Sequence, residues 1–229
     1  MKIRPSGPGA LIRKIAENVS LGGAKRSIDR AIDRGLVRAG WMPEIMDGRG
    51  KVLHMSDTPT AIYGYLARVL RRVNPSVVVH TGDLSDDIKL ELYPGEEERY
   101  HNAAKRLVNI LAAPRRTVYL VLGNHDRADL LPYLPDQFVL VDDAADFTIG
   151  GVMFSISHYV GRTREHPGRF NLFGHEMVTK SYAEGDDRYF LNGVETMRLI
   201  DPVADEIESI GYPRKTNDAR LMRRGRTRC

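Results

Sequence analysis

The chain has 229 residues, of which 42% are hydrophobic and 28% charged, so it can bury a core and keep a polar surface. No apolar stretch approaches the ~20 residues that cross a bilayer, and the first residues lack the apolar segment of a signal peptide. Neither a membrane span nor secretion is therefore expected. Cys229, the only cysteine, cannot close an internal disulfide, which favours a reducing, cytoplasmic setting.

The formal charge of +4 is unevenly distributed. Residues 1–50 carry 10 Lys or Arg against 5 Asp or Glu, and residues 213–229 carry 7 against 1. The two ends together carry +11, which leaves −7 for residues 51–212. Basic ends can bind nucleic acid by releasing its counterions. They can equally lie in solvent or pack on the acidic body.

The first 50 residues predict a basic helical extension and not a domain. Apolar residues recur at helical spacing over residues 9–20 and, more weakly, over 28–36. An amphipathic arm of this kind packs on its own core or on a partner subunit, so an oligomer contact through the arm is one expectation. The chain is thus divided into an extension at 1–50, a body at 51–212 and a basic tail at 213–229.

The body begins with an alternation of strand-like and helix-like segments, at 51–56, 62–73, 76–82, 96–113 and 116–123. This order predicts an α/β domain whose strands are covered on both faces. After about residue 137 the segments are strand-like, without helices of comparable length. We therefore expect a parallel half followed by a hairpin-rich half, arranged as a four-layer α/β/β/α sandwich.

Polar residues follow each of the first three predicted strands and two of the later ones: Asp57, Asp83, Asn124-His125-Asp126, His158 and His175. Each pair such as Gly-Asp or Gly-Asn is ordinary turn chemistry when it stands alone. Ligands bind at the carboxyl ends of strands in open α/β sheets, so the repetition predicts a shared site. Carboxylate, amide and imidazole donors suit Mn, Fe, Zn or Ni and not a metal that prefers thiolates.

In order, these segments read SDTP, GDLSD, GNHD, SH and GHEM. The series resembles the calcineurin-like metallophosphoesterases, whose motifs are D-x-H, G-D-x-x-D, G-N-H-D/E, a lone His and G-H-x-H. The resemblance covers roughly residues 51–200. It implies the fold of that family and metal-dependent hydrolysis of phosphate esters.

Family members build two metal sites that share one aspartate. The resemblance implies that one of these sites is complete here, with the ligands Asp83, Asn124, His158 and His175. The other site keeps Asp57 and the shared aspartate but has Pro59 and Met177 where the family has histidines. A thioether is a poor donor for these metals. His166, in the loop 161–169, is left open as a replacement. One tightly bound ion per chain is expected.

The resemblance also implies roles around the metal. His125 would contact the phosphate and stabilise or protonate the leaving oxygen, and Asp126 would hold its ring. Asp57 would orient the nucleophile or hold a loosely bound second ion. The second aspartate of G-D-x-x-D would secure the metal loop. Arg127 is open as a phosphate clamp, although an ordinary surface arginine is the simpler interpretation.

Two functions fit the sequence. In the first, the protein hydrolyses a phosphodiester or phosphomonoester by metal-activated water. In the second, the protein is a weak or inactive scaffold that binds protein or nucleic acid, as the retromer subunit with this fold does. The losses fall on one metal and spare the other, which favours the enzyme.

Overall fold

The computed structural model of the protein describes residues 46–222. These residues belong to a compact unit that spans Ile45–Cys229. Most of the predicted helical extension, and with it the expected oligomer contact through this arm, lies outside the described residues. The same holds for residues 223–229 of the predicted basic tail.

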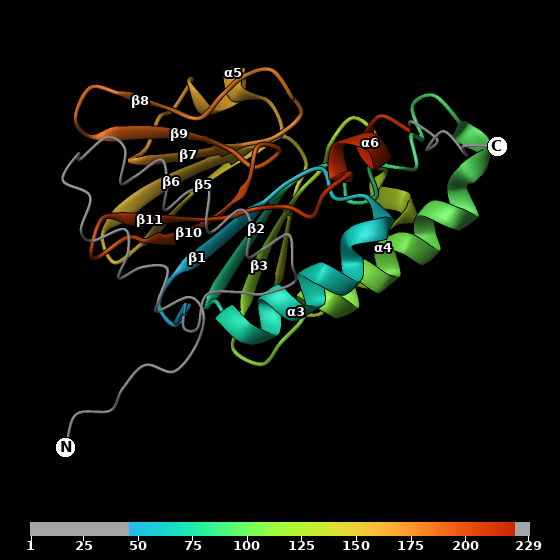
Figure 1. Cartoon of the computed structure of the whole chain (residues 1–229), viewed down its shortest axis with the longest axis horizontal. Helices are drawn as coiled ribbons and strands as arrows, with labels where there is room; N and C mark the ends of the chain where they lie inside the picture. The colour runs from blue at the N-terminus through green and yellow to red at the C-terminus, as the bar shows by residue number, and fades with distance from the viewer. Residues whose placement is uncertain (1–45, 223–229) are drawn as a thin grey trace, which may run out of the picture. The chain divides into compact units, whose positions relative to one another are not determined.

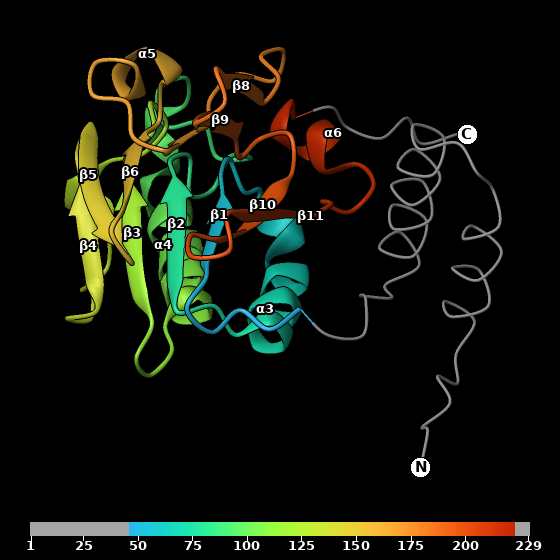
Figure 2. The same cartoon turned by 90° about the vertical axis from the view of Figure 1, so that its left-hand side faces the viewer.

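Six strands form the first sheet, in the order β11-β10-β1-β2-β3-β4. Their bounds are β1 Val52–Met55, β2 Val77–Thr81, β3 Thr117–Val121, β4 Phe138–Val141, β10 Met197–Asp201 and β11 Glu206–Ile210. The four strands from β1 to β4 are parallel, so their carboxyl ends lie at one edge (Figure 2). β10 returns antiparallel to β1, with Leu199 opposite Leu53, and β11 pairs with β10.

The second sheet has five strands in the order β5-β6-β7-β9-β8. Their bounds are β5 Ala144–Ile149, β6 Val152–Ser157, β7 Phe170–Phe173, β8 Tyr182–Glu184 and β9 Arg188–Asn192. Antiparallel pairs join β5 to β6 and β8 to β9, as a hairpin-rich half would have. The centre of the sheet differs from that expectation, because β6, β7 and β9 are parallel to one another.

Two long helices cover the outer face of the first sheet, as Figure 1 shows. They are α3 (Tyr63–Val73), which follows the 3-10 turn η1 (Thr60–Ile62), and α4 (Glu97–Leu111), which follows η2 (Pro94–Glu96). The buried residues of α3 recur at helical spacing, which is why this segment forms an amphipathic helix. α3 ends at Asn74, whose left-handed φ of 47° precedes Pro75.

The remaining helical segments are short: η3 (Ala128–Leu130), α5 (Val160–Thr163) and α6 (Thr216–Arg220). α5 contacts β6 and β7 of the second sheet. The α/β class with two sheets is confirmed. Within residues 46–222, the predicted fourth layer is represented by the four-residue α5 and not by long helices. No helix in this part of the chain is long and apolar enough to cross a membrane.

The main core lies between the two sheets, and its buried residues come from both: Val52, Val79, Val121, Val141, Phe154, Ile156, Phe170, Leu172, Leu191 and Ile200. A row of stacked rings runs through it in the order Tyr119, Phe147, Phe154, Phe170, Tyr189, with successive centroids 4.3 to 5.6 Å apart. Stacked pairs add about 0.5–1.5 kcal/mol each to area burial. The sandwich therefore holds the strand ends that carry the polar residues on a rigid base.

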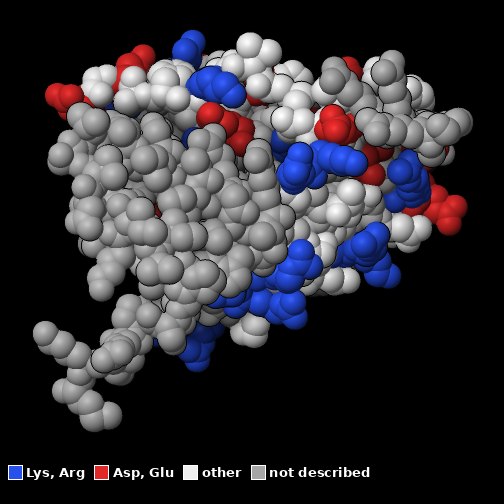
Figure 3. All heavy atoms as spheres, in the orientation of Figure 1, with Lys and Arg blue, Asp and Glu red and all other residues white. Residues whose placement is uncertain are grey.

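Basic side chains gather over the two long helices on the face drawn in Figure 3. Arg68, Arg71 and Arg72 of α3 are exposed, as are Lys105 and Arg106 of α4. The acidic body inferred from composition thus has a basic helical face.

Candidate metal centre

Strand ends from both sheets bring the predicted residues together. Asp57 and Asp83 follow β1 and β2, and Asn124-His125-Asp126 follows β3. His158 and His175 follow β6 and β7, two parallel strands of the second sheet. The site therefore lies where the carboxyl ends of these strands meet.

Four side chains that can each offer a metal-ligand atom converge on one point. Asn124 Oδ1 lies 3.1 Å from His158 Nε2 and 3.0 Å from His175 Nδ1, and the two ring nitrogens are 3.2 Å apart. Asp83 Oδ2 lies 3.7 Å from His158 Nε2. Ligand atoms of Asp83 and of both histidines all lie within 4.8 Å of one another. Two carboxylate or amide oxygens and two imidazole nitrogens at this spacing can surround one divalent transition metal.

Hydrogen bonds outside the group orient the ligands. His158 Nδ1 donates to the carbonyl of Thr81 (2.7 Å), which leaves Nε2 unprotonated and aimed at the other donors. Asn124 Nδ2 donates to Glu91 Oε2 (2.5 Å), which turns the amide oxygen toward the histidines. Tyr159 packs edge-on against the rings of both His158 and His175. These contacts hold the Asn124 oxygen and the ring nitrogens of the two histidines facing one another.

The backbone at the site is held in unusual conformations. Asp57, Asp83 and His175 have left-handed φ values of 51°, 55° and 65°. Such conformations cost an L-residue roughly 1–2 kcal/mol each and collect at functional sites. The loops after β2 and β3 also approach closely, because a Cβ at Gly123 would collide with the Asp83 carboxylate. The chain thus accepts local strain in order to place these ligands.

The electrostatics of the group call for a cation. Burial raises the pKa of Asp83 well above its ordinary value, and the neighbouring carboxylates of Asp57, Asp126 and Asp86 raise it further. Partial burial also lowers the pKa of His175, whose side chain keeps an exposed edge, so the neutral imidazole that can act as a ligand is favoured. A buried aspartate among like charges, beside neutral imidazoles, fits a bound divalent metal.

His125 lies beside the four donors. Its backbone N–H donates to Asp83 Oδ1 (3.0 Å), and its Nδ1 lies 3.4 Å from Glu91 Oε2. Burial, together with the positive charge of Lys89, lowers the pKa of His125 to about 4. The ring is therefore neutral near pH 7 and can donate a hydrogen bond to an anion.

Asp126 differs from its predicted role. Its two oxygens accept from the backbone N–H groups of Asp83 (2.7 Å), Leu84 (3.0 Å) and Gly123 (2.8 Å), and from the Tyr100 hydroxyl (2.9 Å). The carboxylate thus ties the loop after β2 to the loop after β3 and does not hold the His125 ring. The carboxylate that lies near that ring is Glu91.

Asp57 is fixed at the side of the group. Its Oδ2 accepts from the Ser56 hydroxyl (2.5 Å) and from the backbone N–H of His175 (3.1 Å). Its backbone carbonyl accepts from Arg220 Nε (2.7 Å). Asp57 is therefore placed beside the four donors by both strand ends and by α6.

In the half of the site that the sequence predicts to be degenerate, His166 does not replace the missing histidines. Pro59 is buried and directly precedes η1, while Met177 and His166 are exposed. Among the described residues, the groups of candidate metal ligands do not include His166. They do include a second group, formed by Asp83, Asp86 and His125.

The loop after β2 carries Asp86, the second aspartate of G-D-x-x-D, and also Lys89 and Glu91, which the sequence patterns did not identify. Lys89 Nζ forms an ion pair with Asp86 Oδ1, and both side chains are largely buried. Burial and the charge of Asp57 raise the pKa of Asp86 to about 7. The carboxylate of Asp87 accepts hydrogen bonds from the backbone N–H (2.7 Å) and from the hydroxyl (2.6 Å) of Thr60. The density of charged residues between positions 85 and 91 was the available signal.

Arg220 is a further residue outside the motifs. It is buried, and its guanidinium donates to the carbonyls of Ser56 (3.1 Å), Asp57 (2.7 Å) and Val194 (2.7 Å). The first part of the predicted basic tail is thus packed on the body. Arg127, in contrast, forms surface ion pairs with Glu97 and Asp129.

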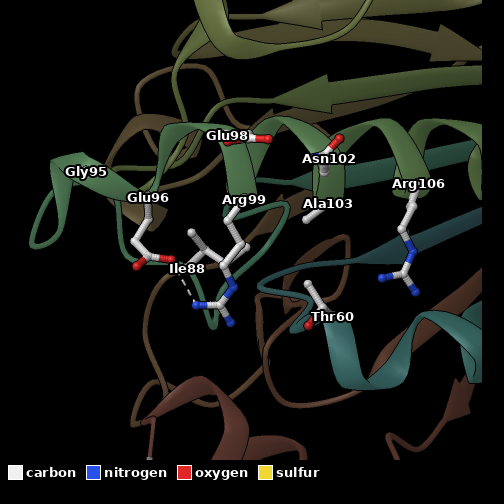
Figure 4. A pocket seen from close by; sticks show the side chains of 9 residues that line it. All are labelled: Thr60, Ile88, Gly95, Glu96, Glu98, Arg99, Asn102, Ala103 and Arg106. Atoms are coloured by element: carbon white, nitrogen blue, oxygen red, sulfur yellow. Dashed lines mark hydrogen bonds and ion pairs between the residues drawn. The ribbon is translucent and has the colours of Figure 1, made fainter.

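A cavity of about 520 Å³ lies beside α4, as Figure 4 shows. Its polar lining includes Thr60, Arg99, Asn102 and Arg106. None of the residues predicted to bind metal lines it, so the cavity and the candidate metal centre are separate features.

Comparison with known proteins places the chain. A search of curated protein sequences finds no significant match. Among solved structures, the chain is similar to a Vps29 from Entamoeba histolytica, at 16% identity and a TM-score of 0.41, over 71% of this chain and 99% of that chain. It is similar to YfcE, a phosphoesterase from E. coli, at 13% identity and a TM-score of 0.44, over 70% and 98%. Another structure aligns with a TM-score of 0.51 at 11% identity, over 71% and 98%.

The last of these similarities concerns the fold alone. The model of the calcineurin-like phosphoesterase family matches residues 50–216, which include every predicted site residue. The family uses divalent metals, and the donor groups at the strand ends agree with that use. With most of its length matched, the chain belongs to the calcineurin-like phosphoesterase family.

Proposed function

We propose that the protein is a metal-dependent phosphoesterase that cleaves a phosphodiester or phosphomonoester with one tightly bound ion. The convergence of Asp83, Asn124, His158 and His175 carries this proposal, because all four face one point and their orienting contacts are in place. Their nitrogen and oxygen atoms suit Mn, Fe, Zn or Ni, and manganese is the first candidate for the bound ion.

The bound metal would lower the pKa of a coordinated water and accept charge from a phosphoryl oxygen. The residues of the chain supply the rest of the chemistry. Asp83, Asn124 and the two histidines would hold and orient this centre. Asp57, fixed by Ser56 and by the His175 N–H, can accept a hydrogen bond from the attacking water.

His125 would act on the leaving group. With a pKa of about 4 it is neutral near pH 7, so it stabilises the leaving oxygen as an N–H donor and not as an imidazolium. Glu91, close to both Asn124 and His125, positions this ring. Removing a donor of this kind lowers turnover by about 10²–10³-fold.

Metal content tests the proposal first. The purified full chain, grown with Mn and Zn supplied, is expected to contain about one transition-metal ion per chain by elemental analysis. His175→Ala is expected to lose that ion, while Met177→Ala is expected to keep it. A wild-type protein without bound metal would contradict the proposal.

Turnover tests the catalytic part of the proposal. The wild type is expected to hydrolyse bis-p-nitrophenyl phosphate, and both His175→Ala and His125→Ala are expected to lose this activity. Met177→Ala serves as the control and is expected to retain it. If the wild type cleaves neither this diester nor a monoester with Mn, Fe, Zn or Ni, the alternative gains: a scaffold of this family that binds protein or nucleic acid.

Nucleic acid is a candidate substrate because of charge. The basic ends of the sequence and the exposed arginines of α3 would attract a polyanion. Cleavage of an oligonucleotide would then weaken steeply between 50 and 200 mM salt, while cleavage of the small diester would not. Equal salt dependence would exclude this substrate class. A reducing, cytoplasmic setting remains part of the proposal.

A further inference from the structure

The degenerate half of the metal centre holds a cluster of negative charge. Asp57, Asp83 and Asp86 are buried, with 3 to 4% of their surface exposed. By the resemblance of the motifs, Pro59 and Met177 occupy the positions of the imidazole ligands of a second ion. Carboxylates buried together are costly unless a cation compensates them.

A cation from the chain itself lies at this cluster. Lys89 extends from the loop after β2 and pairs with Asp86, and the two side chains are only 15% and 5% exposed. Oxygens of Asp83 and Asp86 and a ring nitrogen of His125 lie within 4.8 Å of one another, so the Asp86 carboxylate that Lys89 pairs with belongs to this group. The ammonium group is thus held among the groups that a second ion would contact.

We propose that the Lys89 ammonium takes the place of the second metal ion. The chain then combines one transition metal at Asp83, Asn124, His158 and His175 with one internal cation at Asp86. The catalytic part of this inference rests on the proposed phosphoesterase function. Beside His125, the ammonium supplies a fixed positive charge for the oxygens of a bound phosphate. A lysine is a compact point charge with three donors, which suits this use.

Counting manganese ions tests the substitution without relying on activity. Calorimetric titration of the full chain with Mn²⁺ is expected to give one equivalent for the wild type. Lys89→Met removes the ammonium at similar size, so Asp57, Asp83 and Asp86 become free to bind a second equivalent. Lys89→Arg keeps the charge and is expected to stay at one.

Lys51→Met is the matched control. The Lys51 side chain is 17% exposed, close to the 15% of Lys89, and pairs with two carboxylates, those of Asp201 and Glu208, outside the metal centre. This variant is expected to bind one equivalent. Two equivalents in the wild type, or one in a folded Lys89→Met protein, would overturn the inference. If Lys89→Met does not fold, Lys89→Gln takes its place in the comparison with the wild type. Two equivalents of Mn²⁺ in Lys89→Gln would then support the inference, and one would overturn it.

Activity separates this inference from the proposed function. With one equivalent bound, Lys89→Met is expected to hydrolyse the diester about 10²-fold more slowly than the wild type, and excess Mn²⁺ is expected to restore part of the loss. Failure of the wild type to bind any ion would contradict the proposed function. A wild type with one ion whose Lys89→Met variant keeps full turnover would contradict only the catalytic role of Lys89.

Discussion

At the scale of single residues, the centre depends on contacts that orient ligands as well as on the ligands. The polar residues at strand ends predicted only a shared site, and the resemblance to the family's motifs implied that Asp83, Asn124, His158 and His175 are its ligands. Glu91 belongs to none of these motifs. It stands in an irregular loop, and only folding brings its carboxylate to within 2.5 Å of Asn124 Nδ2.

Glu91→Ala is expected to weaken Mn²⁺ binding by about tenfold, because Asn124 loses the acceptor that turns its oxygen toward the histidines. Glu91 is exposed, so the free energy of unfolding should change by less than about 0.5 kcal/mol. Glu98→Ala, an exposed glutamate in the first turn of α4, is the control. Equal metal affinity in both variants would show that Glu91 has no orienting role.

A second residue-scale prediction concerns His54, which is fully buried and bonded to the Thr81 hydroxyl (2.9 Å). Burial lowers its pKa to about 3, from 6.5 when unfolded. Between about pH 6.5 and pH 3, the unfolded chain therefore binds a proton at His54 that the folded chain does not bind. The stability contributed by neutral His54 is present above pH 6.5 and is lost as the pH falls toward 3.

His54→Gln is expected to remove this loss, since glutamine can keep a hydrogen bond to Thr81 and does not titrate. In urea unfolding with a chelator present, the slope of the unfolding free energy against pH between about 6 and 4.5 should be smaller in the variant. The expected difference is up to about 1.4 kcal/mol per pH unit. Parallel curves would contradict the depressed pKa.

At the scale of elements, periodicity predicted the first half of the body well. The strands β1, β2 and β3 and the helices α3 and α4 lie where apolar spacing placed them. The return of β10 to the first sheet was not predictable, because the pairing of Leu199 with Leu53 joins residues far apart in sequence. Nor does alternation along a strand distinguish a parallel neighbour from a hairpin, which is why the centre of the second sheet was misjudged.

Close approach of the loops after β2 and β3 gives a prediction at this scale. Gly123→Ala is expected to push the Asp83 carboxylate away from the histidines, because the new methyl group would overlap it. Mn²⁺ affinity should fall at least tenfold, and overpacking should cost about 1–3 kcal/mol of stability. Gly161→Ala is the control, since a methyl group at that position would meet no neighbouring atom within 4 Å. Unchanged affinity in Gly123→Ala would disprove the close fit.

At the scale of the whole molecule, α6 joins the last described residues to the ends of β1 and β9. Composition alone assigned residues 213–229 to a basic tail, and charge gives no sign that one arginine of this run is buried. Arg220 differs because the carbonyls of Ser56, Asp57 and Val194 face it. A buried position for an arginine can be found only from the fold that supplies its acceptors.

Two truncations separate the parts of this segment. A chain that stops after Met222 is expected to melt within about 1 °C of the full chain, because α6 stays in place. A chain that stops after Tyr212 loses Arg220 and leaves buried carbonyls without a donor, at about 1–3 kcal/mol each. Its melting temperature should fall by about 5 °C or more. Arg220→Met should reproduce most of that decrease, and equal melting temperatures would contradict the role of Arg220.

The bond from Arg220 to the carbonyl of Asp57 spans 163 positions of the chain. Contacts of such long range form late, because closing a large loop costs conformational entropy before any contact repays it. α6 therefore adds one constraint to Asp57, whose left-handed φ is also supported by the bond from its own N–H to the carbonyl of Gly82 (3.0 Å). Residues 216–220 are the last of the described elements to be synthesised, so Asp57 is expected to gain this constraint only after the residues of both sheets have been made.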